Sequence, residues 1–117
     1  MKDPKGDKAR LLHILDAISE IEDYTQDLDF EGFFRASMPR FASIKQLEII
    51  GEAANNISAD IKERYPDIEW RRIIALRNIL IHEYFGVDAK IVWDIIKGDM
   101  PNLKISIEII LAAFGND

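Results

Sequence analysis

The sequence predicts an all-α fold, an antiparallel bundle of four or five helices joined by short loops. Apolar residues recur at spacings of three and four along most of its 117 residues, and no segment shows a convincing strand pattern. Hydrophobic residues make up 48% of the chain, enough to fill one core. We therefore expect residues 1–117 to form a single domain. The high apolar content also favours a homodimer that pairs through its helices.

The first helix is expected from about Lys8 to Thr25. One apolar stripe marks it, formed by Leu11, Ile14, Leu15, Ile18 and Ile21. His13 falls beside this stripe, and nothing near it in the sequence would make it a ligand or a base. We expect His13 at the surface.

A connector is expected after the first helix. Asp29 can cap a short turn there. The turn should bury three aromatic residues, Phe30, Phe33 and Phe34. Gly32 and the Met38-Pro39 pair argue against a long element before Arg40.

The central helix is predicted from Arg40 to about Arg64, with Ser58 as an internal cap or kink and Pro66 enforcing its end. Its apolar face consists of Ile44, Leu47, Ile50, Ala54, Ile57 and Ile61. Gly51 and the following alanines lack bulk, so another helix can approach closely there. The polar residues among them are predicted either to form buried hydrogen bonds or dimer contacts, or simply to be exposed. They are Glu52, Asn55 and Asn56.

A third long helix and two further helices complete the expected bundle. The buried face of the third consists of Trp70, Ile73, Ile74, Leu80 and Ile81, and Gly86 should stop it. The next helix should start at Asp88, carry Ile91, Val92, Ile95 and Ile96, and end at Gly98. Asp99 and Pro101 should open the last, which carries Leu103, Ile107, Ile110, Leu111 and Phe114.

Composition excludes several classes of site. Cysteine is absent and only His13 and His82 could supply imidazole ligands, so we expect no disulfide, no structural zinc and no cofactor. No stretch reaches the roughly 18 uncharged apolar residues that a membrane span needs, and the charged first residues lack the apolar core of a targeting segment. We therefore expect a cytoplasmic protein with no membrane partner.

The charge distribution limits how nucleic acid could bind. The net charge of −6 argues against a broad basic footprint. Residues 62–77 nevertheless carry a local excess of two positive charges, which leaves −8 on the remainder. The basic residues of this segment are Lys62, Arg64, Arg71, Arg72 and Arg77. They form either an ordinary solvated helix face or a local site for a short single strand or an acidic protein.

The segment from Arg77 to Tyr84 concentrates the chemistry of the chain. Arg77 is a permanent cation whose fork of donors suits phosphate, and His82 can exchange a proton near neutrality. Together they could cleave a phosphodiester without metal. The alternative is that these two residues form a buried polar contact that caps a helix end. For Tyr84 the alternative is a boundary residue with a packed ring and a wet hydroxyl.

Helical geometry constrains this segment. Five positions along an ideal helix turn the chain by about 140°, so Arg77 and His82 would not share a face of an undisturbed helix. Tyr84 returns close to the face of Arg77. The residues converge only if the helix ends near His82, which Gly86 makes plausible, or if a second copy completes the pocket across a two-fold axis. We favour the composite site.

The pattern of Arg77, His82 and Tyr84 resembles the HEPN superfamily, and within it the HepT-like ribonuclease toxins, whose signature is Arg, four residues, His, one residue, Tyr. The similarity covers roughly nine tenths of the chain. It also includes the segment from Leu47 to Ala54, Trp70-Arg71-Arg72-Ile73, and the residues from Tyr84 through Asp88 to Val92-Trp93. The Asn after the arginine and the Val-Asp pair after the tyrosine make the match more specific than Arg and His alone.

The resemblance implies a helical homodimer with its cleft between protomers, metal-independent endoribonuclease activity, and a pair of the HepT/MntA type. In such a pair the toxin has a cognate minimal nucleotidyltransferase as antitoxin. The resemblance assigns catalysis to Arg77 and His82 and an orienting role to Asn78. It matches Tyr84 to the tyrosine that the antitoxin adenylylates. Two other classes remain open: a noncatalytic subunit that binds substrate or partner for a two-component nucleotidyltransferase, and a plain dimeric scaffold.

Overall fold

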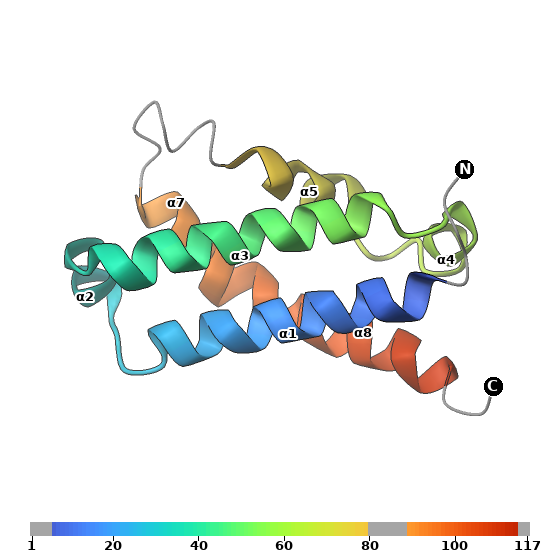
Figure 1. The fold of residues 1–117 in the computed structure, drawn as a ribbon, viewed down its shortest axis with the longest axis horizontal. Coiled ribbons are helices and arrows are strands. Elements are labelled where there is room, and N and C mark those ends of the chain that lie inside the picture. Colours follow the sequence, from blue (N-terminus) through green and yellow to red (C-terminus); the bar gives the residue numbers. More distant parts are fainter. Residues whose placement is uncertain (1–5, 80–88, 115–117) are drawn as a thin grey trace.

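The computed structural model describes residues 6–79 and 89–114, and all regular elements within those ranges are helical (Figure 1). The all-α fold class is therefore confirmed. The longest helices are α1 (Asp7–Thr25), α3 (Ser37–Asn55) and α8 (Met100–Ala113). α1 and α3 pack side by side in opposite directions, and α8 packs on α1. None of the helices in the described ranges is long and apolar enough to cross a membrane.

Helix α1 follows the predicted stripe almost residue for residue. It begins one position before Lys8 and ends at Thr25, and its apolar face is buried at Leu11, Ile14, Ile18 and Ile21. His13 is exposed, as predicted. At the far end of α1, Glu22 accepts a hydrogen bond from Lys104 of α8, which raises the pKa of that lysine.

The predicted connector contains the short helix α2 (Phe30–Arg35) and the first turn of α3. Phe33 is fully buried and its ring packs on Trp93, with the ring centroids 5.0 Å apart. The predicted burial of Phe34 is wrong, because so short a helix turns one face to the core and Phe34 is 54% exposed. The predicted start at Arg40 is also wrong. Pro39 fits the first turn of α3, where its missing N–H breaks no helical hydrogen bond.

Asp29 is the N-cap of α2, as the sequence predicts. Its Oδ1 accepts a hydrogen bond from the backbone N–H of Gly32 at 2.8 Å. Replacing Asp29 with alanine is expected to lower the free energy of unfolding by about 1 kcal/mol, because an N-terminal donor of α2 loses its acceptor. Urea denaturation measures the loss. Asp27→Ala, two positions earlier and exposed, is the control and should change stability by less than about 0.5 kcal/mol. Equal losses in both variants would contradict the capping role.

The predicted central helix is two helices. α3 ends at Asn55, and α4 (Ala59–Arg64) begins after Ser58, whose Oγ accepts from the backbone N–H of Ile61 at 3.3 Å. The predicted cap at Ser58 is thus confirmed. Ser58 is also tied to the start of α1: its backbone N–H and its hydroxyl both donate to the buried carboxylate of Asp7, at 2.9 and 2.6 Å.

Within the described residues, the third predicted helix begins as α5 (Trp70–Ala75) and then tightens into the 3-10 turn η2 (Leu76–Asn78). Its buried face differs from the predicted one, since Ile73 and Ile74 are partly exposed. Among residues 70–79 the buried ones are Trp70, Leu76 and Ile79. The other predicted residues of this region, Leu80, Ile81, Gly86 and Asp88, lie outside the described residues.

The predicted helix end at Gly98 is wrong. α7 (Ala89–Asp94) continues through the π-helical turn η3 (Ile95–Asp99) directly into α8. The backbone N–H of Met100 donates to Ile95 O, which is the wider hydrogen bond of a π turn. This wider turn lies just before Pro101, whose ring would clash with the carbonyl four residues earlier in a regular α-helix.

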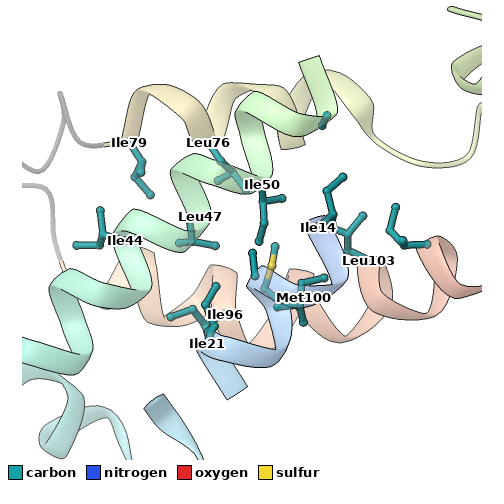
Figure 2. Packing of buried hydrophobic residues seen from close by; sticks show 14 of the residues in the cluster. Ile14, Ile21, Ile44, Leu47, Ile50, Leu76, Ile79, Ile96, Met100 and Leu103 are labelled. Atoms are coloured by element: carbon teal, nitrogen blue, oxygen red, sulfur yellow. The ribbon is translucent and has the colours of Figure 1, made fainter. Parts of the chain in front are cut away.

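The core lies where α1, α3, η2, η3 and α8 meet (Figure 2). Leu76 and Ile79 point from the 3-10 turn and the residue after it toward α3. Their neighbours on α3 are Ile44, Leu47 and Ile50. The opposite side of the core is filled by Ile96, Met100 and Leu103. The turn that carries Arg77 is therefore anchored on both sides of that residue by buried apolar side chains.

Candidate active site

Arg77 and Asn78 lie in the 3-10 turn η2, which packs against α3. Arg77 is half-buried and Asn78 is exposed. A 3-10 helix has 3.0 residues per turn, whereas an α-helix has 3.6. The rotation per residue of an ideal α-helix therefore does not apply at Arg77. His82 and Tyr84, the other predicted site residues, lie outside the described residues.

Gly51 of α3 lies directly against the backbone of the turn that carries Arg77. A Cβ atom built on Gly51 would be 2.2 Å from Arg77 N, 2.9 Å from Leu76 C and 3.0 Å from Arg77 Cα. Real Cβ atoms essentially never show contacts under 3.0 Å, and the obstructing atoms belong to the backbone and cannot rotate away. The close approach predicted for the small residues of this helix is thus found at Gly51.

The guanidinium of Arg77 faces the carboxylate of Glu52, the residue after Gly51. Arg77 Nη1 and Glu52 Oε2 are 3.8 Å apart, and the arginine side chain is 38% exposed. At that distance the groups attract without forming a short hydrogen bond, and the guanidinium keeps a side open to solvent. An anion could reach it from that side.

Asn56 holds the same glutamate from the next helical turn. Its Nδ2 donates to Glu52 Oε1 at 3.3 Å and to Glu52 O at 3.0 Å. Sequence reasoning left open whether these polar residues bond or are exposed. Glu52 does both, since it is exposed and also engages Asn56 and Arg77. The spacing of four between Glu52 and Asn56 could have indicated their bond, but not the contact with Arg77.

The basic segment 62–77 is largely balanced by carboxylates in space. Three of its cations form ion pairs, Arg64 with Asp60 at 3.1 Å, Arg72 with Asp99 at 2.8 Å and Arg77 with Glu52 at 3.8 Å. Surface pairs of this kind favour an ordinary solvated helix face over a local site for a short single strand or an acidic protein. Arg77 is distinguished from the others by the backbone contact beneath it.

A groove of about 710 Å³ lies beside η2, between α5 and the α7–α8 segment. Its wall is mostly apolar and includes Ile73, Ile79, Ile91, Ile95 and Leu103. The Arg72 and Asp99 side chains also line it. Among residues 6–79 and 89–114, no group of three or more His, Asp or Glu side chains is placed to hold a metal ion.

Comparison with known proteins identifies the family. The family described as Ribonuclease HepT-like matches residues 14–110. The chain is 43% identical over 103 residues to a Methanocaldococcus jannaschii protein named as a putative RNase, covering 88% of this chain and 94% of that protein. It is 44% identical over 100 residues to the probable ribonuclease HepT of Thermococcus cleftensis, covering 86% and 91%. No solved structure matches the chain.

A more distant relative is also similar over most of its length. A protein of Caldanaerobacter subterraneus subsp. tengcongensis, also named as a putative RNase, is 34% identical over 107 residues, which cover 92% of this chain and 96% of that protein. The family match spans both the helix that carries Gly51 and Glu52 and the turn that carries Arg77. The chain therefore belongs to the Ribonuclease HepT-like family and is an enzyme of the ribonuclease class.

Proposed function

We propose that this protein is a metal-independent endoribonuclease in which Arg77 and His82 carry the chemistry. Neutral His82 removes the proton from an RNA 2′-hydroxyl, and the resulting oxygen attacks the adjacent phosphorus. Arg77 stabilises the charge that develops on the nonbridging oxygens. The bond to the 5′-oxygen breaks, which leaves a 2′,3′-cyclic phosphate and a 5′-hydroxyl. DNA lacks the nucleophile and is spared.

The proposed site is completed by a second copy of the chain. A leaving 5′-oxygen needs a proton, and each chain carries a single histidine in the segment after Arg77. In a homodimer, the partner's His82 could supply that proton while the first histidine acts as the base. Asn78, which follows Arg77 in the same exposed turn, would orient the site.

One structural observation supports this assignment above the others. Arg77 is a half-exposed cation on a turn that is fixed from below by Gly51 and by the buried Leu76. A fixed but accessible guanidinium is the arrangement that electrostatic stabilisation of a phosphoryl transition state requires. The sequence motif then adds a base and a phenol within the next seven residues.

Cleavage of RNA in the presence of a chelator tests the proposal. Purified protein should cut single-stranded RNA in EDTA and leave DNA of the same sequence intact, with cyclic phosphate ends. Arg77→Ala and His82→Ala should each lower the rate by about 100-fold or more. Arg71→Ala removes an exposed arginine from the preceding helix and should change the rate by no more than about twofold. Cleavage no greater than background by the original protein and by all variants would instead indicate a noncatalytic binding subunit.

We further propose that the enzyme is a cytoplasmic toxin controlled by a minimal nucleotidyltransferase antitoxin that adenylylates Tyr84. A bulky anion added beside the cleft would repel the RNA phosphate and block access. Co-expression with a cognate minimal nucleotidyltransferase should add the mass of one AMP residue and abolish both cleavage and growth inhibition. Tyr84→Phe should acquire no such mass and should stay toxic in the presence of the antitoxin. Modification at another residue would contradict the assignment.

A further inference from the structure

We infer that Glu52 is the positioning residue of Arg77, an inference that rests on the proposed function of that arginine. The two side chains come from different elements, Glu52 from α3 and Arg77 from η2, and their charged atoms are 3.8 Å apart. Glu52 is not placed among the reacting groups, because a carboxylate repels an RNA phosphate. Its effect on catalysis would pass through the guanidinium.

Each oxygen of the Glu52 carboxylate interacts with a different neighbour. Oε1 accepts from Asn56 Nδ2 at 3.3 Å, and Oε2 is the oxygen that faces Arg77. The backbone carbonyl of Glu52 accepts from the same amide at 3.0 Å. Asn56 therefore favours one rotamer of the exposed Glu52, and in that rotamer the carboxylate attracts the Arg77 guanidinium.

Helix α3 thus controls Arg77 at both ends. Gly51 sets the position of its backbone, since the turn lies where a side chain at residue 51 would be. Glu52 sets the direction of its guanidinium, which retains 38% exposure. A long, flexible arginine gains catalytic value when its donors are aimed in advance at the charge that will develop. Two consecutive residues of one helix provide that preorganisation here.

Positioning predicts a particular kinetic signature. Without the charge of Glu52, Arg77 remains a cation that attracts RNA phosphate, so the KM should stay the same or fall. The guanidinium would no longer be held in the orientation that the transition state needs, so kcat should fall by about tenfold. A role in folding alone would lower the melting temperature and leave kcat of the folded protein unchanged.

The experiment compares Glu52→Gln with Glu48→Gln, which removes a carboxylate one turn earlier on α3 that pairs with Lys45 at 2.9 Å. Only Glu52→Gln should lower kcat. Asn56→Ala should lower it in the same direction by a smaller factor. In an Arg77→Lys background, the Glu52→Gln change should add little, because lysine lacks the planar fork that Glu52 directs.

Side-chain NMR gives a readout that does not depend on RNA cleavage. The Nε–Hε group of Arg77 should show increased motion in Glu52→Gln and not in Glu48→Gln. Unchanged motion and an unchanged kcat, with Arg77→Ala inactive, would overturn the inference and leave the proposed function standing. A faster Glu52→Gln enzyme would also overturn it, since the glutamate would then compete with RNA. Cleavage that survives Arg77→Ala would instead overturn the proposed function, and the inference with it.

Discussion

Replacing Gly51 with valine is expected to lower the free energy of unfolding by about 3 kcal/mol, at the upper end for overpacking, and to reduce RNA cleavage as well. The first atom of any side chain at this position would be 2.2 Å from the backbone nitrogen of Arg77. The obstructing atoms are backbone and belong to a turn anchored by the buried Leu76 and Ile79. The steric clash can therefore be relieved only if α3 and η2 separate, and this separation also displaces Arg77.

Gly98→Val is the matched control for this change. Gly98 is also helical, and a Cβ atom built there meets nothing within 4 Å. Valine is slightly better than glycine in a helix, so stability should stay within about 0.5 kcal/mol of the original or rise by a similar amount. Urea denaturation and RNA cleavage of both variants check the result. Similar losses at Gly51 and Gly98 would show that the close approach to Arg77 is not the cause.

Replacing Asp7 with alanine is expected to lower the free energy of unfolding by about 3 kcal/mol. Its carboxylate is 2% exposed and accepts from both the backbone N–H and the hydroxyl of Ser58. Hydrogen bonds to a charged group stabilise by about 1.5–3 kcal/mol, and the mutation would also leave a buried N–H without its acceptor. The turn between α3 and α4 would lose its hydrogen bonds to the start of α1.

Asp7→Asn should recover part of that loss. The asparagine carbonyl can still accept from the backbone N–H of Ser58, and its amide can donate to the serine hydroxyl. Asp94→Ala removes an exposed carboxylate that pairs with Lys90 at 3.0 Å and should cost no more than about 0.5 kcal/mol. Thermal and urea unfolding of the three variants measure their order of stability. A loss at Asp7 no larger than that at Asp94 would contradict the tie.

The long helices could be predicted from the sequence because each has a clear apolar period. The bounds of α1 were found to within one residue, and the caps at Asp29 and Ser58 were predicted because Asp and Ser side chains accept from nearby backbone N–H groups. The split between α3 and α4 was harder to predict. It is stabilised by Asp7, which is remote in the sequence and leaves no local signal.

The errors have equally specific causes. Gly98 resembles a helix stop, but glycine is tolerated inside a helix, and here the π turn carries the chain onward to Pro101. The motif predicts catalytic roles for Arg77 and His82, and these stay predictions. It could not predict the contact of Arg77 with Glu52, which depends on how η2 packs against α3.

The π turn η3 also restricts how the length of this chain can vary. A π turn is equivalent to one additional residue inserted into an α-helix, and each helical residue rotates the chain by about 100°. Deleting one residue from 95–99 would rotate α7 relative to α8 by that angle. Val92, which is buried, would then leave the core, and the exposed face of α7 that carries Ile91 would point in a different direction. Insertions and deletions should therefore be tolerated less at this turn than at the loop between α1 and α2.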